Sequence, residues 1–252
     1  MSAVFSCSID DGHPSDMRAA ELLAKHGLNA TFYIPIKNRE GLDVLCSQAI
    51  RQLGEQFEIG SHTLDHRFLK DVRLPEARYQ ICEGKSRLED LIGRQVHGFC
   101  YPGGKYRPEH IELVAAAGFS YARTTLNLCF DIGSRPFEMP TTVQFYPHER
   151  DVYLRNFVRG GSWTRRQDGL RLALRHANWL ARLYALFDHS FEHNGVFHLW
   201  GHSRDIDRFE AWDEFDRFLA YVAAHMPRRN CVSNAELAAR SFVLAPEAAA
   251  TV

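Results

Sequence analysis

Short apolar runs alternate with amphipathic segments along this chain, and no other feature constrains its fold as strongly. The first run, Ala3–Ile9, precedes a helical segment from about Ser15, and a second run follows at Ala30–Ile34. Further runs occur at Val96–Tyr101 and Phe119–Thr124. Strands that alternate with helices pair in parallel, because each helix carries the chain back along the sheet. The sequence therefore predicts an α/β fold with helices around a parallel sheet.

The second half of the chain is expected to contain a long helix and no domain boundary. Residues 169–191 form one long amphipathic helical pattern. We find no linker rich in proline, glycine or serine and no internal repeat. We therefore expect one domain over residues 1–244, followed by an alanine-rich tail, 245–252, that is disordered.

Two adjacent carboxylates, Asp10 and Asp11, follow the first predicted strand in the string SIDDG (8–12). Two anions this close repel each other, so a fold that keeps them together needs a charge that offsets them, and a bound cation is the usual one. The alternative is an Asx turn that closes the strand, because Asp-Gly is common in turns.

Two histidines, His62 and His66, lie four residues apart in GSHTLDH (60–66). On a helical turn this spacing places both imidazoles on one face, within reach of one metal. Together with a carboxylate they make a three-ligand site with an open position for water, which is typical of catalytic metal sites. A second pair, His189 and His193, has the same spacing, but we expect it at the end of a surface helix, where imidazoles suit the helix dipole.

Two later segments place aromatic and polar groups after predicted strands. In FCYPGGKY (99–106) a strand ends in Tyr-Pro and two glycines follow, so the backbone can approach a ligand closely there. In GVFHLWGHS (195–203) a late strand ends close to His202. The carboxyl ends of parallel strands are where barrels and open sheets build their sites, and all four segments fall there.

These four segments, in this order, resemble the polysaccharide deacetylases of carbohydrate esterase family 4, the NodB-homology family. The resemblance covers about residues 5–205 and implies that the predicted domain is a single irregular (β/α)7 barrel. It implies a metal-dependent hydrolase that removes N-acetyl groups from an N-acetylated sugar or glycan precursor through a metal-activated water. The metal expected is Zn²⁺, with other divalent transition metals as alternatives.

The same resemblance implies roles for individual residues. Asp11, His62 and His66 match the metal ligands of the family. Asp10 matches the catalytic base, which takes a proton from the attacking water. His202 matches the general acid, which protonates the leaving amine.

Five residues are expected to bind the substrate. By the resemblance, Leu199 lines the pocket for the acetyl methyl group. A backbone N–H near Gly103, in the segment that also contains Pro102, is expected to hold the oxyanion. Tyr101 and Trp200 either stack on a sugar ring or pack in the core.

The chain departs from the family pattern at two points. Many members carry an arginine in the third motif that holds the catalytic aspartate, and this chain has Cys100 there. Arg123, at the end of the next strand, is a candidate substitute partner of the base, and a surface salt bridge is the alternative. For the aspartate that orients the acid histidine, Asp205 and Asp131 are two candidates.

Composition limits the expected partners and the compartment. Thirty basic residues balance thirty-one acidic ones, for a net charge of −1 without a long basic run, so neither nucleic acid nor an anionic membrane surface is expected. No apolar stretch of about 18 residues predicts a membrane span. Six cysteines without Cys-x-x-Cys spacing, and an N-terminus without an export signal, suggest a cytoplasmic protein. The sequence does not determine the oligomeric state.

Two other functions are compatible with these residues. A related metal-dependent amidohydrolase would use them on a small cyclic amide or imide, and it would need a closed pocket with a charged anchor. A non-catalytic glycan-binding relic is the second alternative. The presence of the three metal ligands and both acid–base residues disfavours this relic.

Overall fold

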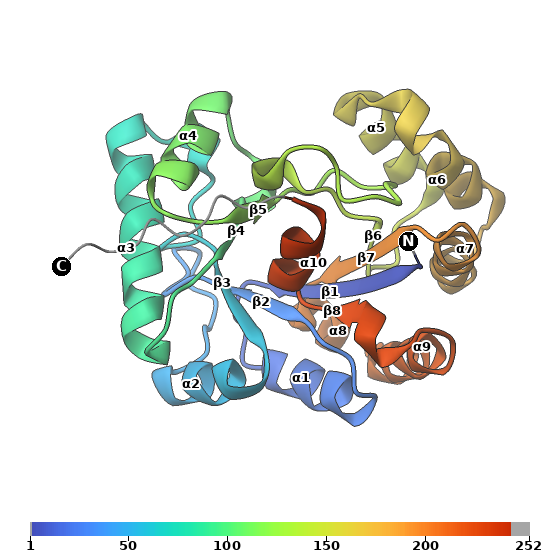
Figure 1. Ribbon diagram of the computed structural model, residues 1–252, viewed down its shortest axis with the longest axis horizontal. Helices are drawn as coiled ribbons and strands as arrows, with labels where there is room; N and C mark the ends of the chain where they lie inside the picture. Colours follow the sequence, from blue (N-terminus) through green and yellow to red (C-terminus); the bar gives the residue numbers. More distant parts are fainter. Residues whose placement is uncertain (1, 243–252) are drawn as a thin grey trace.

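Eight parallel strands form the centre of the computed structural model, which describes residues 2–242 (Figure 1). The strands are β1 (Val4–Asp10), β2 (Thr31–Ile34), β3 (Glu58–Ser61), β4 (Gly98–Cys100), β5 (Tyr121–Arg123), β6 (Val143–Gln144), β7 (Val196–Gly201) and β8 (Cys231–Val232). Seven of them follow the order β5-β4-β3-β2-β1-β7-β6, and β8 pairs with the first half of β1. The pairing is parallel throughout, as the alternation of strands and helices predicts.

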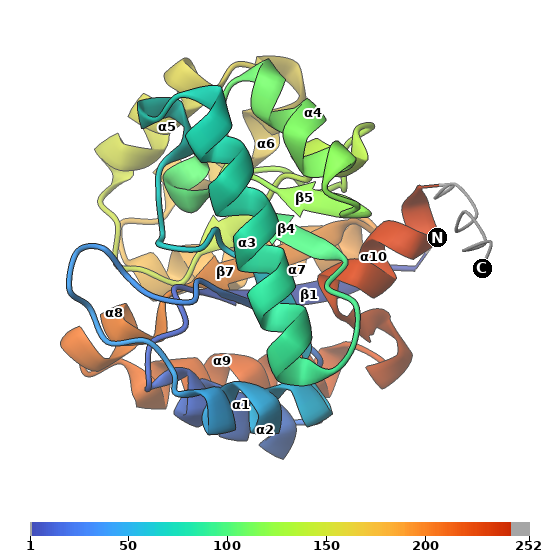
Figure 2. The same ribbon diagram turned by 90° about the vertical axis from the view of Figure 1, so that its left-hand side faces the viewer.

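Helices surround this sheet (Figures 1 and 2). The α-helices are α1 (Asp16–Lys25), α2 (Ser47–Gln56), α3 (Leu74–Ile92), α4 (Pro108–Ala116), α5 (Arg150–Gly160), α6 (Trp163–Arg175), α7 (Trp179–Glu192), α8 (Ser203–Arg208), α9 (Trp212–His225) and α10 (Asn234–Ser241). Short 3₁₀ segments are η1 (Leu69–Asp71), η2 (Pro102–Gly104), η3 (Pro136–Glu138) and η4 (Arg228–Asn230). Most helices lie in a ring around the strands, and α10 lies across them in Figure 1.

The sheet curves into a barrel that does not close fully. Between β5 and β6, the described part of the chain joins the sheet by one isolated bridge, Arg123 to Met139. The fold class expected from the sequence, an irregular α/β barrel, is therefore confirmed. The barrel is irregular because β5 and β6 are only three and two residues long. Strands this short cannot form a full ladder of hydrogen bonds with each other.

Side chains of β1 alternate between two environments, because successive residues of a strand point to opposite faces. One set is apolar and joins the main hydrophobic core: Phe5, Cys7 and Ile9. The other set is polar, buried and hydrogen-bonded to other polar groups inside the barrel: Ser6, Ser8 and Asp10. The face of β1 that points into the barrel is therefore polar, and its other face joins the apolar core.

A polar network at the start of the strands fills one end of the barrel. Asn234, the first residue of α10, donates its side-chain amide to the Tyr33 hydroxyl at 2.9 Å and accepts from Ser6 Oγ at 2.6 Å. Thr31 Oγ1 donates to Glu58 at 2.7 Å, also at the first residues of their strands. Since buried polar groups need partners, this network closes the amino end of the barrel and leaves the carboxyl end for a site.

The expectation of one long helix over residues 169–191 is wrong, because the chain forms two helices there. α6 ends at Arg175 and α7 begins at Trp179. The break has a local cause: the Asn178 side chain accepts a hydrogen bond from the Ala181 N–H at 3.0 Å and caps α7. α5 was not expected from the sequence.

Three other expectations concern the ends of the chain, membranes and cysteines. The expected tail, 245–252, lies outside the described residues, and the single domain over 1–244 stays a prediction. None of the helices described combines the length and the apolarity needed to cross a bilayer. All six cysteines are unpaired, four of them buried. The compartment stays a prediction.

Candidate active site

A cavity of about 1030 Å³ opens at the carboxyl ends of the strands. Every acid–base and metal-ligand candidate from the sequence lies on its wall: Asp10, Asp11, His62, His66 and His202. These residues follow or end three different strands, so the parallel arrangement brings them to one end of the barrel.

Asp11 and two histidines converge on one point of this wall. His66 Nε2 lies 3.1 Å and His62 Nε2 3.5 Å from Asp11 Oδ1. One ligand atom from each of the three residues lies within 4.8 Å of the others. The backbone φ angle of Asp11 is 80°, a value that residues other than glycine rarely adopt. Such strain is common where a fold has to position a functional group.

The two histidines do not lie on a helical turn, so that expectation is wrong. After β3 the chain turns through Thr63 and His66, whose φ angles are 67° and 55°. The Leu64 N–H donates to the carbonyl of Gln80 on α3 at 2.9 Å, which holds this loop in place. The ring centroids of His62 and His66 are consequently 5.0 Å apart. Packing against α3, rather than a local helix, sets the geometry of the pair.

The protonation and charge of these groups suit a divalent cation. His62 Nδ1 lies 2.8 Å from the Cys100 carbonyl oxygen, which can only accept, so Nδ1 donates there. Nε2 is then the nitrogen that faces Asp11, and in the neutral imidazole it offers a lone pair to a cation. Asp11 Oδ1 is buried and has no hydrogen-bond partner among residues 2–242. Burial raises the pKa of Asp11, but the two histidines outweigh burial and hold this pKa well below its usual range. An ionised carboxylate and imidazole nitrogens form a typical ligand set for Zn²⁺.

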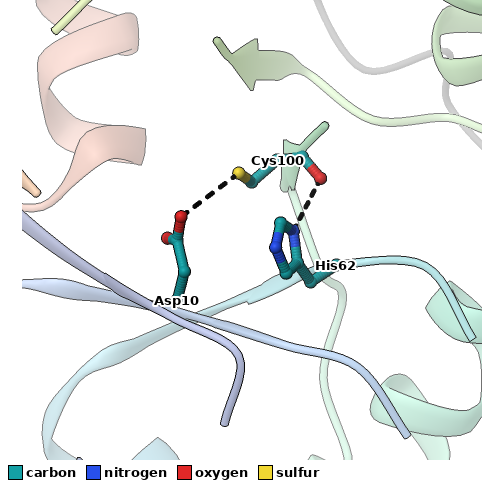
Figure 3. Close-up of side chains that lie close together, drawn as sticks. All are labelled: Asp10, His62 and Cys100. Atoms are coloured by element: carbon teal, nitrogen blue, oxygen red, sulfur yellow. Dashed lines mark hydrogen bonds between the residues drawn. The ribbon is translucent and has the colours of Figure 1, made fainter. Parts of the chain in front are cut away.

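Asp10 lies beside this group and has two neighbours of its own. Arg123, which is fully buried, forms an ion pair with Asp10 Oδ1. Cys100 Sγ lies 3.8 Å from Asp10 Oδ2 (Figure 3). The surface salt bridge considered for Arg123 is therefore wrong, and Arg123 contacts the candidate base instead.

The register of the sheet explains why Arg123 can reach Asp10. Cys100 on β4 pairs directly with Arg123 on β5, and residues paired across two strands point to the same face. The arginine that the third motif lacks is thus supplied from the neighbouring strand. Its guanidinium also lies 5.0 Å from the ring centroid of Trp200, within cation–π range.

Asp10, His62 and Cys100 form a second group with metal-ligand atoms, shown in Figure 3. Two observations make it the weaker candidate. Burial raises the pKa of the Cys100 thiol well above its usual value, so the sulfur keeps its proton. One Asp10 oxygen is also occupied by Arg123.

His202 lies on the wall of the same cavity, close to Asp11. Its Nδ1 donates to Asp205 Oδ2 at 2.9 Å, and its Nε2 lies 3.9 Å from Asp11 Oδ2. Burial lowers the pKa of His202, but the Asp205 hydrogen bond and the charges of Asp11 and Asp10 raise it to about 9. Of the two aspartates considered for orienting this histidine, Asp205 contacts it.

The other aspartate, Asp131, lies elsewhere. It pairs with Arg165, and half of its side chain is exposed. The second histidine pair also lies apart from the site. His189 and His193 stack at the end of α7, with ring centroids 4.2 Å apart. Neither belongs to a group of three potential metal ligands within the described chain.

The residues expected to bind substrate divide into two sets. Gly103 and Trp200 line the cavity. Pro102 and Leu199 are buried, and neither is among the residues that line the cavity. Leu199 pairs in register with Cys7 and belongs to the same apolar core. Because side chains alternate along β7, Trp200 faces the cavity, and the expectation that Leu199 lines it does not fit the structure.

Tyr101 is also covered rather than free to stack on a ligand. It is fully buried, and its hydroxyl donates to the Phe137 carbonyl at 3.2 Å. The ring of Tyr106 stacks on it at a centroid distance of 4.2 Å, and Tyr106 is the one that lines the cavity. Of the packing and stacking alternatives for Tyr101, packing agrees with the structure.

Sequence reasoning missed one polar pair beside the acid histidine. Gln144 is the last residue of β6, and its side-chain nitrogen Nε2 lies 3.4 Å from His202 Nδ1. Its Oε1 lies 2.9 Å from His148 Nε2, so that imidazole nitrogen carries the proton. A polar residue at the end of a strand was the available signal, but β6 is only two residues long and has little apolar pattern.

Residues 3–122 match the family model for polysaccharide deacetylases. "Putative polysaccharide deacetylase YxkH" from Bacillus subtilis (strain 168) is 23% identical over 120 residues, which are 47% of this chain and 43% of that protein. The match thus spans less than half of the curated relative. The family-model match includes Asp10 and both site histidines, and it ends before Arg123.

Two solved structures share the fold over most of the chain. A family 4 acetyl xylan esterase from Clostridium thermocellum, in complex with a cobalt ion, has a TM-score of 0.56 at 15% identity and covers 92% of this chain and 89% of its own. A peptidoglycan N-acetylglucosamine deacetylase has a TM-score of 0.53 at 16% identity, with 87% and 83% covered. These two structures support the fold, and the family match over residues 3–122 confirms the resemblance expected from the sequence motifs.

Proposed function

We propose that this chain, which matches the polysaccharide deacetylase family over residues 3–122, is a metal-dependent hydrolase that removes N-acetyl groups from an N-acetylated glycan or glycan precursor. One observation carries the proposal: the ligand atoms of Asp11, His62 and His66 lie within 4.8 Å of one another, in a cavity that is also lined by the candidate base Asp10 and the candidate acid His202. This is the arrangement that metal-assisted amide hydrolysis requires.

The proposed metal ligands are Asp11 Oδ1 and the Nε2 atoms of His62 and His66. A divalent metal at this position lowers the pKa of water and polarises a carbonyl group. Zn²⁺ is the first candidate, because one carboxylate and two imidazoles form a three-ligand set that leaves a position open. Other divalent transition metals accept the same ligands, so the identity of the ion is part of the proposal.

Asp10 and His202 are proposed to move the protons. Asp10 Oδ2 accepts the proton of the attacking water, while Arg123 forms an ion pair with the other carboxylate oxygen, Oδ1. His202 Nε2–H then donates to the amide nitrogen as the carbon–nitrogen bond breaks, so that acetate and a neutral amine leave. Asp205 holds His202 in position through the hydrogen bond from His202 Nδ1. In this proposal Asp205 itself takes no part in the proton transfers.

The size of the cavity favours a glycan over a small cyclic imide. Pockets for small molecules typically occupy about 300–1,000 Å³. The cavity here, about 1030 Å³, lies at the upper end of that range, and it is lined by Tyr106 and Trp200 as well as the polar groups. Aromatic rings of this kind suit the faces of sugar rings. The imide-hydrolase alternative would call for a smaller, closed pocket.

Acetate release is the direct test of this function. The purified protein, loaded with Zn²⁺, is expected to release acetate from oligomers of N-acetylglucosamine and to leave a panel of cyclic imides intact. Hydrolysis of an imide without acetate release would support the amidohydrolase alternative. A metal-loaded protein that binds the oligomers and hydrolyses neither substrate would be the glycan-binding relic.

Replacing Asp205 by asparagine is expected to move the alkaline limb of the kcat profile to lower pH. The Asp205 hydrogen bond raises the pKa of His202, so removing that charge lowers the pKa. His202 then loses its proton at a lower pH, and the acid form needed for catalysis disappears earlier. The measurement is kcat against pH. Asp213→Asn, on the exposed face of α9, is the control and should leave the limb in place.

A further inference from the structure

Three of the seven large apolar side chains that are exposed in the described chain lie within ten residues of one another. Leu154 is 48% exposed, Val158 is 60% exposed and Trp163 is 59% exposed. They lie on α5 and at the start of α6, at the upper right edge of the molecule in Figure 1. We call these three residues the α5–α6 patch. Clustered exposed apolar groups usually mark an interaction surface, whereas single ones do not.

The fold does not need the α5–α6 patch for its own packing. α5 has another apolar face, on which Tyr153 is buried under Arg182 and Phe157 packs against Arg166. That inner face attaches the helix to the rest of the protein. Leu154 and Val158 are four residues apart, so they lie together on the outer side of the helix.

Arginines are frequent along the two helices that carry this patch. Residues 150–175 contain seven arginines and two aspartates, a balance of +5 in a chain whose net charge is −1. Asp151, the acidic residue of α5, lies 3.6 Å from Arg155, and Arg165 is paired with Asp131 of the preceding loop. Arg171 is paired with Asp168, and Arg166 is fully buried. Without Arg166, and with Asp131 included, six arginines face three aspartates, so a balance of +3 remains. Trp, Leu and Val beside several arginines form the pattern of segments that lie in a membrane interface.

We propose that the α5–α6 patch docks this protein on an anionic phospholipid membrane. Leu154, Val158 and Trp163 enter the boundary between headgroups and acyl chains, and Arg155, whose side chain is 50% exposed, lies at the lipid phosphates. Net charge did not indicate this, because it averages over the whole chain, whereas attraction to a charged surface is local and acts within about 10 Å at moderate ionic strength.

The position of the patch also bears on the substrate. The same helix supplies wall residues of the cavity, among them Tyr153 and Asn156. Docking through the patch would bring the cavity to the membrane surface. If the proposed deacetylase function holds, the natural substrate is an N-acetylated glycan attached to a membrane lipid.

Sedimentation with vesicles tests the docking. The protein is expected to sediment with vesicles of phosphatidylcholine and phosphatidylglycerol at least about tenfold better than with phosphatidylcholine alone, and less well at high salt. The triple variant Leu154→Ser/Val158→Ser/Trp163→Ser should lose at least about tenfold of this binding. The control Leu74→Ser/Tyr79→Ser changes side chains that are 42% and 53% exposed on α3, and it should bind like the wild type.

Tryptophan fluorescence supplies a second measurement. The fluorescence emission of the wild-type protein should shift to shorter wavelength on addition of the anionic vesicles, because the indole ring of Trp163 enters the membrane. Trp163→Phe removes this indole ring and should therefore remove most of the shift. Acetate release from soluble oligomers should be unchanged in the triple variant, since none of its three sites lines the cavity. Failure of the deacetylase assay would therefore leave the docking result standing, and the reverse is also true.

Several results would overturn the docking proposal. One is wild-type protein that ignores anionic vesicles at low ionic strength. Another is equal vesicle binding by the triple variant and the α3 control. A wild-type dimer that the triple variant converts to a monomer, measured by light scattering, would assign the patch to a second copy of the chain instead.

Discussion

Changing His62 to alanine is expected to remove the bound divalent metal and essentially all deacetylase activity. His62 is one of three proposed ligands, and its Nε2 is the lone-pair nitrogen because Nδ1 donates to the Cys100 carbonyl. Even residues outside the ligand set typically contribute about 10–100-fold to metal affinity, so the loss of a ligand should exceed this. Elemental analysis of the purified variant measures the metal, and acetate release measures the activity.

His189→Ala is the matched control for this experiment. His189 has a histidine partner at the same spacing, but it lies at the end of α7 and belongs to no ligand cluster in the described structure. Metal content and activity should equal those of the wild type. A His62→Ala protein that remains folded by circular dichroism and keeps its metal would show that the ligand assignment is wrong.

Replacing Asp10 by asparagine is expected to lower kcat by about 10²–10⁴-fold while the metal stays bound. This is the range measured for general acid–base groups, and asparagine keeps the shape of the side chain but cannot accept the proton. Asp11→Asn is expected to behave differently, because it weakens metal binding itself. Steady-state kinetics with saturating metal, together with metal titrations of both variants, separates the two roles.

A stability measurement belongs with the Asp10 experiment. Arg123 is buried and pairs with Asp10, so asparagine leaves a buried cation with a weaker partner. Breaking a buried ion pair typically costs about 3–5 kcal/mol, and the melting temperature should fall. If Asp10→Asn loses the metal and Asp11→Asn keeps it, the roles of the two aspartates are reversed.

Local sequence patterns were sufficient for the features that depend on neighbouring residues. The alternation of apolar runs with helices predicted a parallel sheet, and parallel strands place their carboxyl ends together. It follows that Asp11, His62 and His202, each close to the end of a strand, should share one end of the barrel. The structure brings these residues to one cavity. No knowledge of the register between strands was needed for this inference.

Features that depend on pairing between distant segments could not be obtained in this way. Whether Arg123 replaces the arginine missing at Cys100 depends on the register of β4 and β5, which the sequence of neither strand specifies. Likewise, Asp205 and Asp131 were equivalent candidates until the fold placed one beside His202 and the other on the surface. These contacts are set by tertiary packing.

The sequence by itself therefore determined the kinds of chemical group at the site and the end of the sheet where they lie. Periodicity and motif spacing are local quantities, and they point to the segments that contain Asp10, Asp11, His62 and His66. Only the tertiary structure decided which partners those groups have and which side chains are exposed. Trp200 rather than Leu199 faces the cavity, and Leu154 and Val158 face outward, because strand register and helix packing choose one face of each element.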